Sequence, residues 1–115
     1  MSALAIIKIA CAVFTIGFGL YSVVAPRAIK GFTGLDVTGP RGVTEIRAVM
    51  GGTFVGLGLA PLVLGFSAGA YQALGIAYFA IALIRAVSMF LDKSVVSSNI
   101  ISLVSEVVLG VLLVL

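Results

Sequence analysis

The residues of this chain that could do chemistry are charged and polar side chains placed inside or beside long apolar segments. They are two arginines, three acids and a serine: Glu45, Arg47, Arg85, Ser88, Asp92 and Glu106. A charged group within bilayer hydrocarbon is costly, so it usually faces a helix interface or water and often marks a site. Such a cluster is either an ion-pair network that fixes helix register or a site for an anion, a lipid headgroup or a proton. The residue types alone leave both alternatives open.

Helical spacing predicts which of these residues meet, because residues three or four positions apart, or seven apart, share a helix face. Two such series run through the C-terminal half: Tyr71, Tyr78, Arg85 and Asp92 in one, and Ser98, Ser102, Glu106 and Gly110 in the other. At about 1.5 Å of rise per residue, Arg85 and Glu106 each lie about 10 Å from the same membrane boundary. We therefore predict that Arg85 pairs with Glu106, directly or through water, and that Glu45 is the third member of the cluster.

Glu45 and Arg47 are two positions apart, about 200° around a helix, so they cannot face the same partner. We place Glu45 inward, because Gly52 and Gly56 share its face and form a GxxxG pair that favours close helix packing. Arg47 is then left to a neighbouring helix or to a lipid phosphate. Gly110 is expected to pack in the same way on the last helix. A further series marks the inner face of the first apolar segment: Lys8, Cys11, Thr15, Gly19 and Ser22.

The usual groups of a catalytic or metal site are missing from the sequence. There is no histidine, and the one cysteine, Cys11, lies in an apolar run where it fits a filler of the core. We therefore expect no enzymatic activity, no cofactor and no metal. The net charge of +3 arises from seven basic and four acidic residues that are scattered along the chain. That pattern is too sparse for a nucleic-acid partner.

The elements that position these residues are predicted to be membrane helices. Of the 115 residues, 62% are hydrophobic and 10% are charged, and the mean hydropathy is +1.33. A soluble domain of this size could not bury so much apolar surface. A spanning helix needs about 20 mostly apolar residues, and four windows qualify: 3–25, 43–65, 70–91 and 97–115. We predict a single all-α domain, an integral membrane four-helix bundle with antiparallel up-down topology.

The connections predict the orientation. The loop 26–42 and the loop 92–98 fall at the same end of such a bundle, and that end carries most of the lysines and arginines. The positive-inside rule places both loops in the cytoplasm and both termini in the periplasm or outside the cell, as for a bacterial inner membrane protein. The first loop is either a plain solvated loop or a short surface helix near residues 25–35. Ser97, Ser98 or Asn99 is expected to cap the last helix.

Several short strings of the sequence resemble a known family. They are the run Glu45–Gly52 (EIRAVMGG), the Gly56-Leu57-Gly58 triplet, Arg85 with Ser88 and Asp92, and Glu106 with Gly110. In these strings the chain resembles small four-span bacterial membrane proteins grouped as domain of unknown function 4345, which are loosely similar to DoxX-like proteins. The resemblance covers residues 25–115 and implies the four-helix fold and the same cluster, without an activity or substrate. Met50 departs from the aromatic residue expected before the glycine pair.

Two functions follow as expectations. The first is a non-enzymatic accessory or structural subunit of a membrane complex, because the loops are short and small residues are abundant on the helix faces. Its partners would be membrane lipids, other membrane protein subunits or further copies of itself. The alternative is a small transporter, or a carrier that binds a lipid or an anion at the Glu/Arg cluster. Glu45, Arg85 and Glu106 favour this alternative.

Overall fold

The computed structural model describes all 115 residues and contains helices and no strands. Four helices are long and apolar enough to cross a membrane, so the predicted all-α, four-span architecture is confirmed. The second span is one continuous helix, Pro40–Val63, whose middle turn is a π-helix. The elements in chain order are α1 (Ala3–Val24), α2 (Lys30–Thr33), α3 (Pro40–Glu45), η1 (Ile46–Gly51), α4 (Gly52–Val63), α5 (Ala68–Leu91) and α6 (Ser97–Val114).

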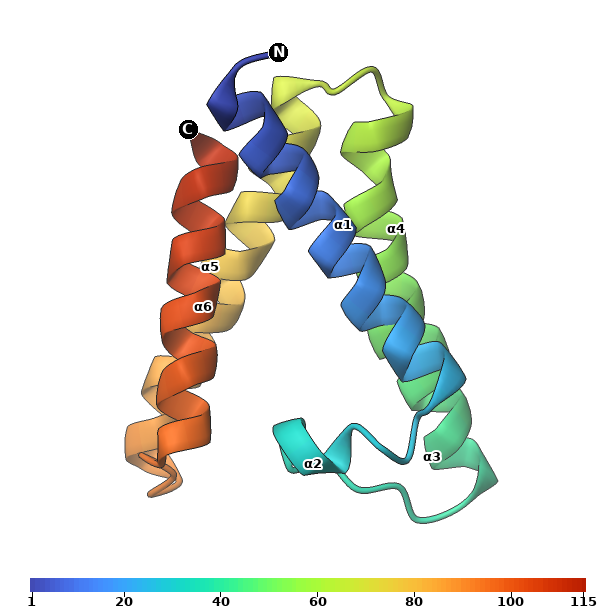
Figure 1. The fold of residues 1–115 in the computed structure, drawn as a ribbon. Helices are drawn as coiled ribbons and strands as arrows, with labels where there is room; N and C mark the ends of the chain where they lie inside the picture. Colours follow the sequence, from blue (N-terminus) through green and yellow to red (C-terminus); the bar gives the residue numbers. More distant parts are fainter.

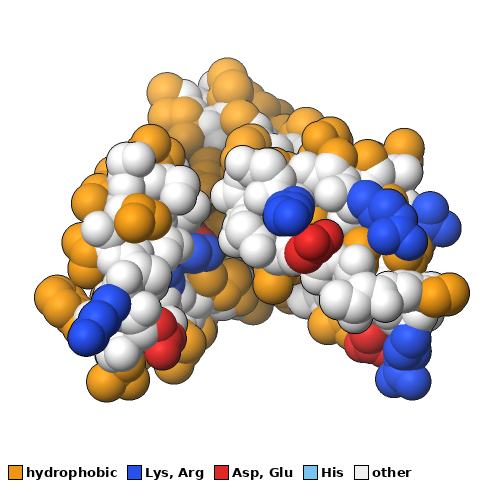
Figure 2. Space-filling model, turned by 90° about the horizontal axis from the view of Figure 1, so that it is seen from below, with side chains coloured by type: hydrophobic (Ala, Val, Ile, Leu, Met, Phe, Trp, Pro, Cys, Tyr) orange, Lys and Arg blue, Asp and Glu red, His pale blue; other side chains and the backbone are white.

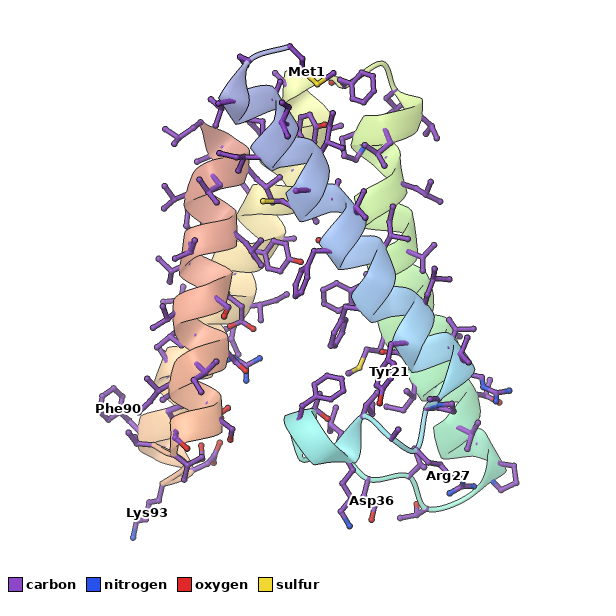
Figure 3. The ribbon with its side chains drawn as sticks, viewed as in Figure 1. Met1, Tyr21, Arg27, Asp36, Phe90 and Lys93 are labelled. Carbon is purple, nitrogen blue, oxygen red and sulfur yellow. The ribbon has the colours of Figure 1, made fainter.

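The four spans are arranged as two helix pairs. In one pair α1 lies against the second span, and in the other α5 lies against α6 (Figure 1). The pairs meet at the end that holds both chain termini and diverge toward the opposite end, so that the bundle has the shape of a wedge. Figure 3 places Arg27, Asp36 and Lys93 at that opposite end, far from Met1. The two polar loops therefore share one end, which we call the loop end.

Local signals explain where the helices begin. The Ser2 hydroxyl accepts a hydrogen bond from the Ala5 amide at 3.1 Å, and the Ser67 hydroxyl accepts one from Ala70 at 3.2 Å. These are ordinary N-caps for α1 and α5. The second span begins at Pro40 rather than at residue 43, because proline fits the first position of a helix. The expected loop 26–42 is shorter by that amount.

The start of α6 and the first loop settle two further expectations. The N-cap of α6 is Val96, which makes no side-chain bond, so the prediction of a Ser97, Ser98 or Asn99 cap is wrong. Asn99 is used elsewhere, as described below. The first loop contains the short helix α2, which ends at Gly34 in the left-handed conformation. The Phe32 ring of α2 meets the Phe18 ring of α1 edge-on at 5.6 Å, and this contact folds the loop back against the first span.

The glycines that allow close packing are not the predicted ones. A Cβ on Gly58 would lie 2.8 Å from the Ala12 carbonyl oxygen, and one on Gly19 would lie 2.7 Å from the Gly51 carbonyl oxygen. These residues bring α1 and the second span together. Gly52 and Gly56 are exposed, and a Cβ on either would meet nothing closer than 4.0 Å, so their predicted packing role is wrong. The reason is η1: its turns are wider than α-helical turns, so a spacing of seven across it does not return to the same face.

The core lies where the two pairs meet. Six residues form it: Cys11, Ala12, Tyr71, Leu74, Tyr78 and Leu113. The Tyr78 hydroxyl of α5 and the Thr15 hydroxyl of α1 are 2.6 Å apart, and Thr15 also donates to the Cys11 carbonyl. This bond ties one pair to the other. As predicted, Gly110 packs closely: a Cβ there would lie 2.7 Å from the Phe79 ring of α5.

Candidate functional site

Arg85 of α5 and Glu106 of α6 form a two-pronged ion pair. Arg85 Nε donates to Glu106 Oε1 and Arg85 Nη2 donates to Oε2, both at 2.7 Å. The side chains are 30% and 12% exposed, respectively. The planar guanidinium matches the carboxylate in this geometry, which gives short, charge-assisted hydrogen bonds. The predicted direct pairing of Arg85 with Glu106 is therefore present in the structure.

A third side chain completes the arrangement. Arg85 Nη1 donates to Asn99 Oδ1 at 2.9 Å, and Asn99 Nδ2 donates to the Ser94 carbonyl at 2.9 Å. Asn99 lies seven residues before Glu106, which is about two turns of α6, so both face α5. Sequence reasoning considered Asn99 only as a helix cap. Its spacing from Glu106 is the signal that would have found this role.

The guanidinium of Arg85 has N–H donors that these bonds do not use. It carries five N–H groups, and the two bonds to Glu106 with the one to Asn99 use three of them. Arg85 borders a hollow of about 520 Å³ on the surface of α5. Ser88, Ser94 and Asn99 supply its other polar groups. The site therefore offers hydrogen-bond donors while the charge of its arginine is balanced by Glu106.

A second, larger hollow adjoins the first. It has a volume of about 570 Å³ and lies between the second span and α5, and ten of its twelve lining residues are hydrophobic. Phe54 and Leu57 line one side, and Leu74 and Tyr78 line the other. Ala80 and Ile81 border both hollows. We call the two together the lateral groove. Seen from the loop end, the molecule is hollowed between its two halves, with charged side chains within the hollow (Figure 2).

Glu45 is not the third member of the Arg85 cluster. Arg41 Nε donates to Glu45 Oε1 at 3.0 Å, and the Glu45 side chain is 51% exposed. Glu45 borders the lateral groove on the second span, across from α5. The prediction is wrong because the helix pairs diverge toward the loop end, which keeps the second span away from Arg85 and Glu106 there.

The remaining predicted residues lie apart from the ion pair. Ser88 donates to Asp92 Oδ2 at 2.6 Å along α5, and neither residue bonds to Arg85. Ser88 borders the hollow beside Arg85, whereas Asp92 is exposed at the loop end. Arg47 is exposed and pairs with no carboxylate; with Arg27 it borders a third hollow of about 580 Å³. The six predicted residues therefore divide into the Arg85–Glu106 pair, the Ser88–Asp92 pair, and two residues, Glu45 and Arg47, that belong to neither.

Comparison with known proteins identifies a family and gives no activity. Residues 3–115 match the family described as Domain of unknown function (DUF4345). No curated protein and no solved structure matches the chain. The broader similarity to DoxX-like proteins and the bacterial source stay predictions. With four helices able to cross a membrane and a family match over almost its whole length, this chain is a small multi-span membrane protein that belongs to the DUF4345 family.

Proposed function

We propose that this protein binds a membrane amphiphile in the lateral groove, with the polar head at Arg85 and an acyl or isoprenoid chain between the second span and α5. The observation that carries the proposal is that the two hollows share part of their lining. Ala80 and Ile81 form a shared wall, so one occupant can reach Arg85 at one end and the apolar lining at the other. Each hollow by itself, at about 520 Å³ and about 570 Å³, falls within the range of about 300–1,000 Å³ of small-molecule pockets.

The charge of the site selects the kind of head. Glu106 already neutralises Arg85 through two hydrogen bonds, so an anion entering the site would have to displace a carboxylate or stay partly unpaired, which is costly at this depth. The two unused N–H groups of Arg85 instead suit a neutral acceptor oxygen. An ester or ketone carbonyl meets this requirement.

The apolar part of the groove supplies the affinity. Each buried methylene group contributes about 0.8 kcal/mol relative to water, but bilayer lipid already shields a chain from water. The gain for a chain in the groove therefore comes from close packing against rings and branched side chains such as Phe54 and Tyr78. The hydrogen bonds at Arg85 add selectivity for the head.

This proposal takes up the carrier alternative and asks for no chemistry from the protein. A role as an accessory subunit remains an expectation. The outer faces expose many apolar side chains, but bilayer lipid covers such side chains, so their exposure does not require a partner protein. We also propose that the loop end is cytoplasmic in a bacterial inner membrane, because Arg27, Lys30, Arg41 and Lys93 gather there.

The experiment fills the groove without touching the ion pair. Ala80→Phe places a ring on the wall that the two hollows share, and Ala73→Phe adds the same ring to an exposed position of α5 that borders neither hollow. Each variant is purified in mild detergent, incubated with dioleoylglycerol and examined by native mass spectrometry. We expect a one-to-one adduct with the wild type and Ala73→Phe, and little adduct with Ala80→Phe. Equal retention by both variants would refute the groove as the binding site.

A further inference from the structure

A second cationic feature lies on the other helix pair, at the junction of α1, the first loop and the second span. Arg27 and Arg47 border the same hollow there, with a volume of about 580 Å³. The walls include Pro26, which is buried, and Pro40. Proline fixes its own backbone angle, so the two prolines hold the segments that carry the arginines. This hollow is separate from the lateral groove and shares no lining residue with it.

Neither of these two arginines forms an ion pair within the protein. The nearby acids are both engaged: Asp36 accepts from Lys30 at 3.1 Å, and Glu45 accepts from Arg41 at 3.0 Å. The hydrogen bond from Lys30, followed by the one from the Val37 amide, holds the pKa of Asp36 below its ordinary value, and the charge of Arg27 adds only a smaller effect. The third ion pair of the chain is Arg85 with Glu106. Two guanidinium groups therefore border one hollow with no carboxylate partner.

The depth of the two arginines matches lipid headgroups. The apolar part of the second span runs from Ile46 to Val63, a length of about 27 Å at 1.5 Å per residue. This is close to the thickness of about 30 Å of bilayer hydrocarbon. Arg47 thus lies at the boundary where hydrocarbon ends, and Arg27 follows three residues after α1 ends. Figure 3 shows Arg27 at the loop end beside the second span.

We propose that Arg27 and Arg47 clamp the phosphate of one anionic phospholipid. A guanidinium presents paired N–H groups that suit two phosphate oxygens at once, and two guanidiniums around one hollow can hold the group from two sides. The headgroup of an anionic lipid such as phosphatidylglycerol carries no cation. A zwitterionic lipid brings an ammonium group, which the arginines repel. The position at the hydrocarbon boundary favours a lipid phosphate over free phosphate. This site is independent of the lateral groove and of the function proposed for it.

The test compares lipid retention by the full chain and matched variants. Protein in mild detergent is mixed with equal amounts of dioleoylphosphatidylglycerol and dioleoylphosphatidylcholine and examined by native mass spectrometry. Arg27→Gln and Arg47→Gln each remove one exposed arginine. Lys93→Gln removes the same charge at the loop end, on the other helix pair, and is the control. We expect the wild type and the control to prefer one phosphatidylglycerol, and each arginine variant to lose about tenfold in that preference.

A second variant separates the clamp from general attraction to a basic surface. Replacing both arginines by lysine keeps the charge and the fold but removes the paired N–H geometry, so we expect a loss of several fold. An equal loss of preference in Lys93→Gln, or full retention by the double lysine variant, would overturn the clamp. Inorganic phosphate is titrated in parallel by calorimetry. Binding of inorganic phosphate without any retained phosphatidylglycerol would overturn the assignment to a lipid.

Discussion

Breaking the Arg85–Glu106 pair one partner at a time should cost more than removing both charges together. Glu106→Gln leaves a guanidinium without its counter-ion about two helical turns inside the membrane boundary, and it exchanges two charge-assisted hydrogen bonds for at most one to an amide oxygen. Arg85→Gln leaves a carboxylate that is 12% exposed. In the double variant two neutral amides face each other and can hydrogen-bond.

The magnitude follows from burial. Removing one partner of a fully buried pair costs about 3–5 kcal/mol. The side chains of Arg85 and Glu106 are 30% and 12% exposed, so the pair is only partly buried, and we expect about 2–3 kcal/mol for either single substitution. The double variant should lose less stability than the sum of the two single losses. We expect the difference to be at least about 1 kcal/mol, which is within the range of couplings measured between membrane helices.

The assay is a double-mutant cycle of unfolding free energies in mixed detergent, with helicity as the readout. Ser105→Ala serves as the control, because Ser105 is exposed on α6 and its hydroxyl bonds only to the Ile101 carbonyl of its own helix. It should change stability by less than about 0.5 kcal/mol. Additive effects of Arg85→Gln and Glu106→Gln would show that the two charges are not coupled and would refute a stabilising role for the pair.

Two further predictions concern packing and topology. Gly58→Leu should lower stability by about 1–3 kcal/mol, because the new side chain meets the Ala12 carbonyl. Gly56→Leu should have almost no effect, because the position is open. Similar melting profiles for the two variants in detergent would contradict this packing. In a Cys11→Ser background, single cysteines at Thr38 and Ser67 should react with an impermeant thiol reagent from opposite sides of the membrane, and labelling of both from one side would exclude the four-span topology.

Much of the fold follows from the sequence because lipid removes most alternatives: each apolar run of about 20 residues must form a helix. The inner face of α1 was predicted from small and polar residues at helical spacing, and Cys11, Thr15, Gly19 and Ser22 are all buried. The Arg85–Glu106 pair was predicted because each residue lies on the polar face of its own helix at a similar depth. Both predictions hold because, in a regular α-helix, the spacing of residues in the sequence determines which of them share a face.

The wrong predictions depend on features of the structure that helical periodicity in the sequence does not indicate. The π-helical turn η1 changes which residues of the second span face α1, so Gly51 and Gly58 pack there and Gly52 and Gly56 do not. No local residue pattern specified that turn. Likewise, the divergence of the two helix pairs depends on packing between distant segments. It separates Glu45 from Arg85, although both residues border the lateral groove.

The two arginine sites differ in charge balance, and their depths explain the difference. Arg85 lies inside the hydrocarbon boundary, where an unpaired ion is costly, so it needs a counter-ion from the protein and Glu106 supplies it. Arg27 and Arg47 lie at the level of the headgroups, where the counter-ion can be a lipid phosphate, and neither forms an ion pair with a carboxylate of the protein. The same residue type therefore suits a neutral acceptor at one depth and an anion at the other. A lipid that satisfies one site is, by its charge, a poor ligand for the other.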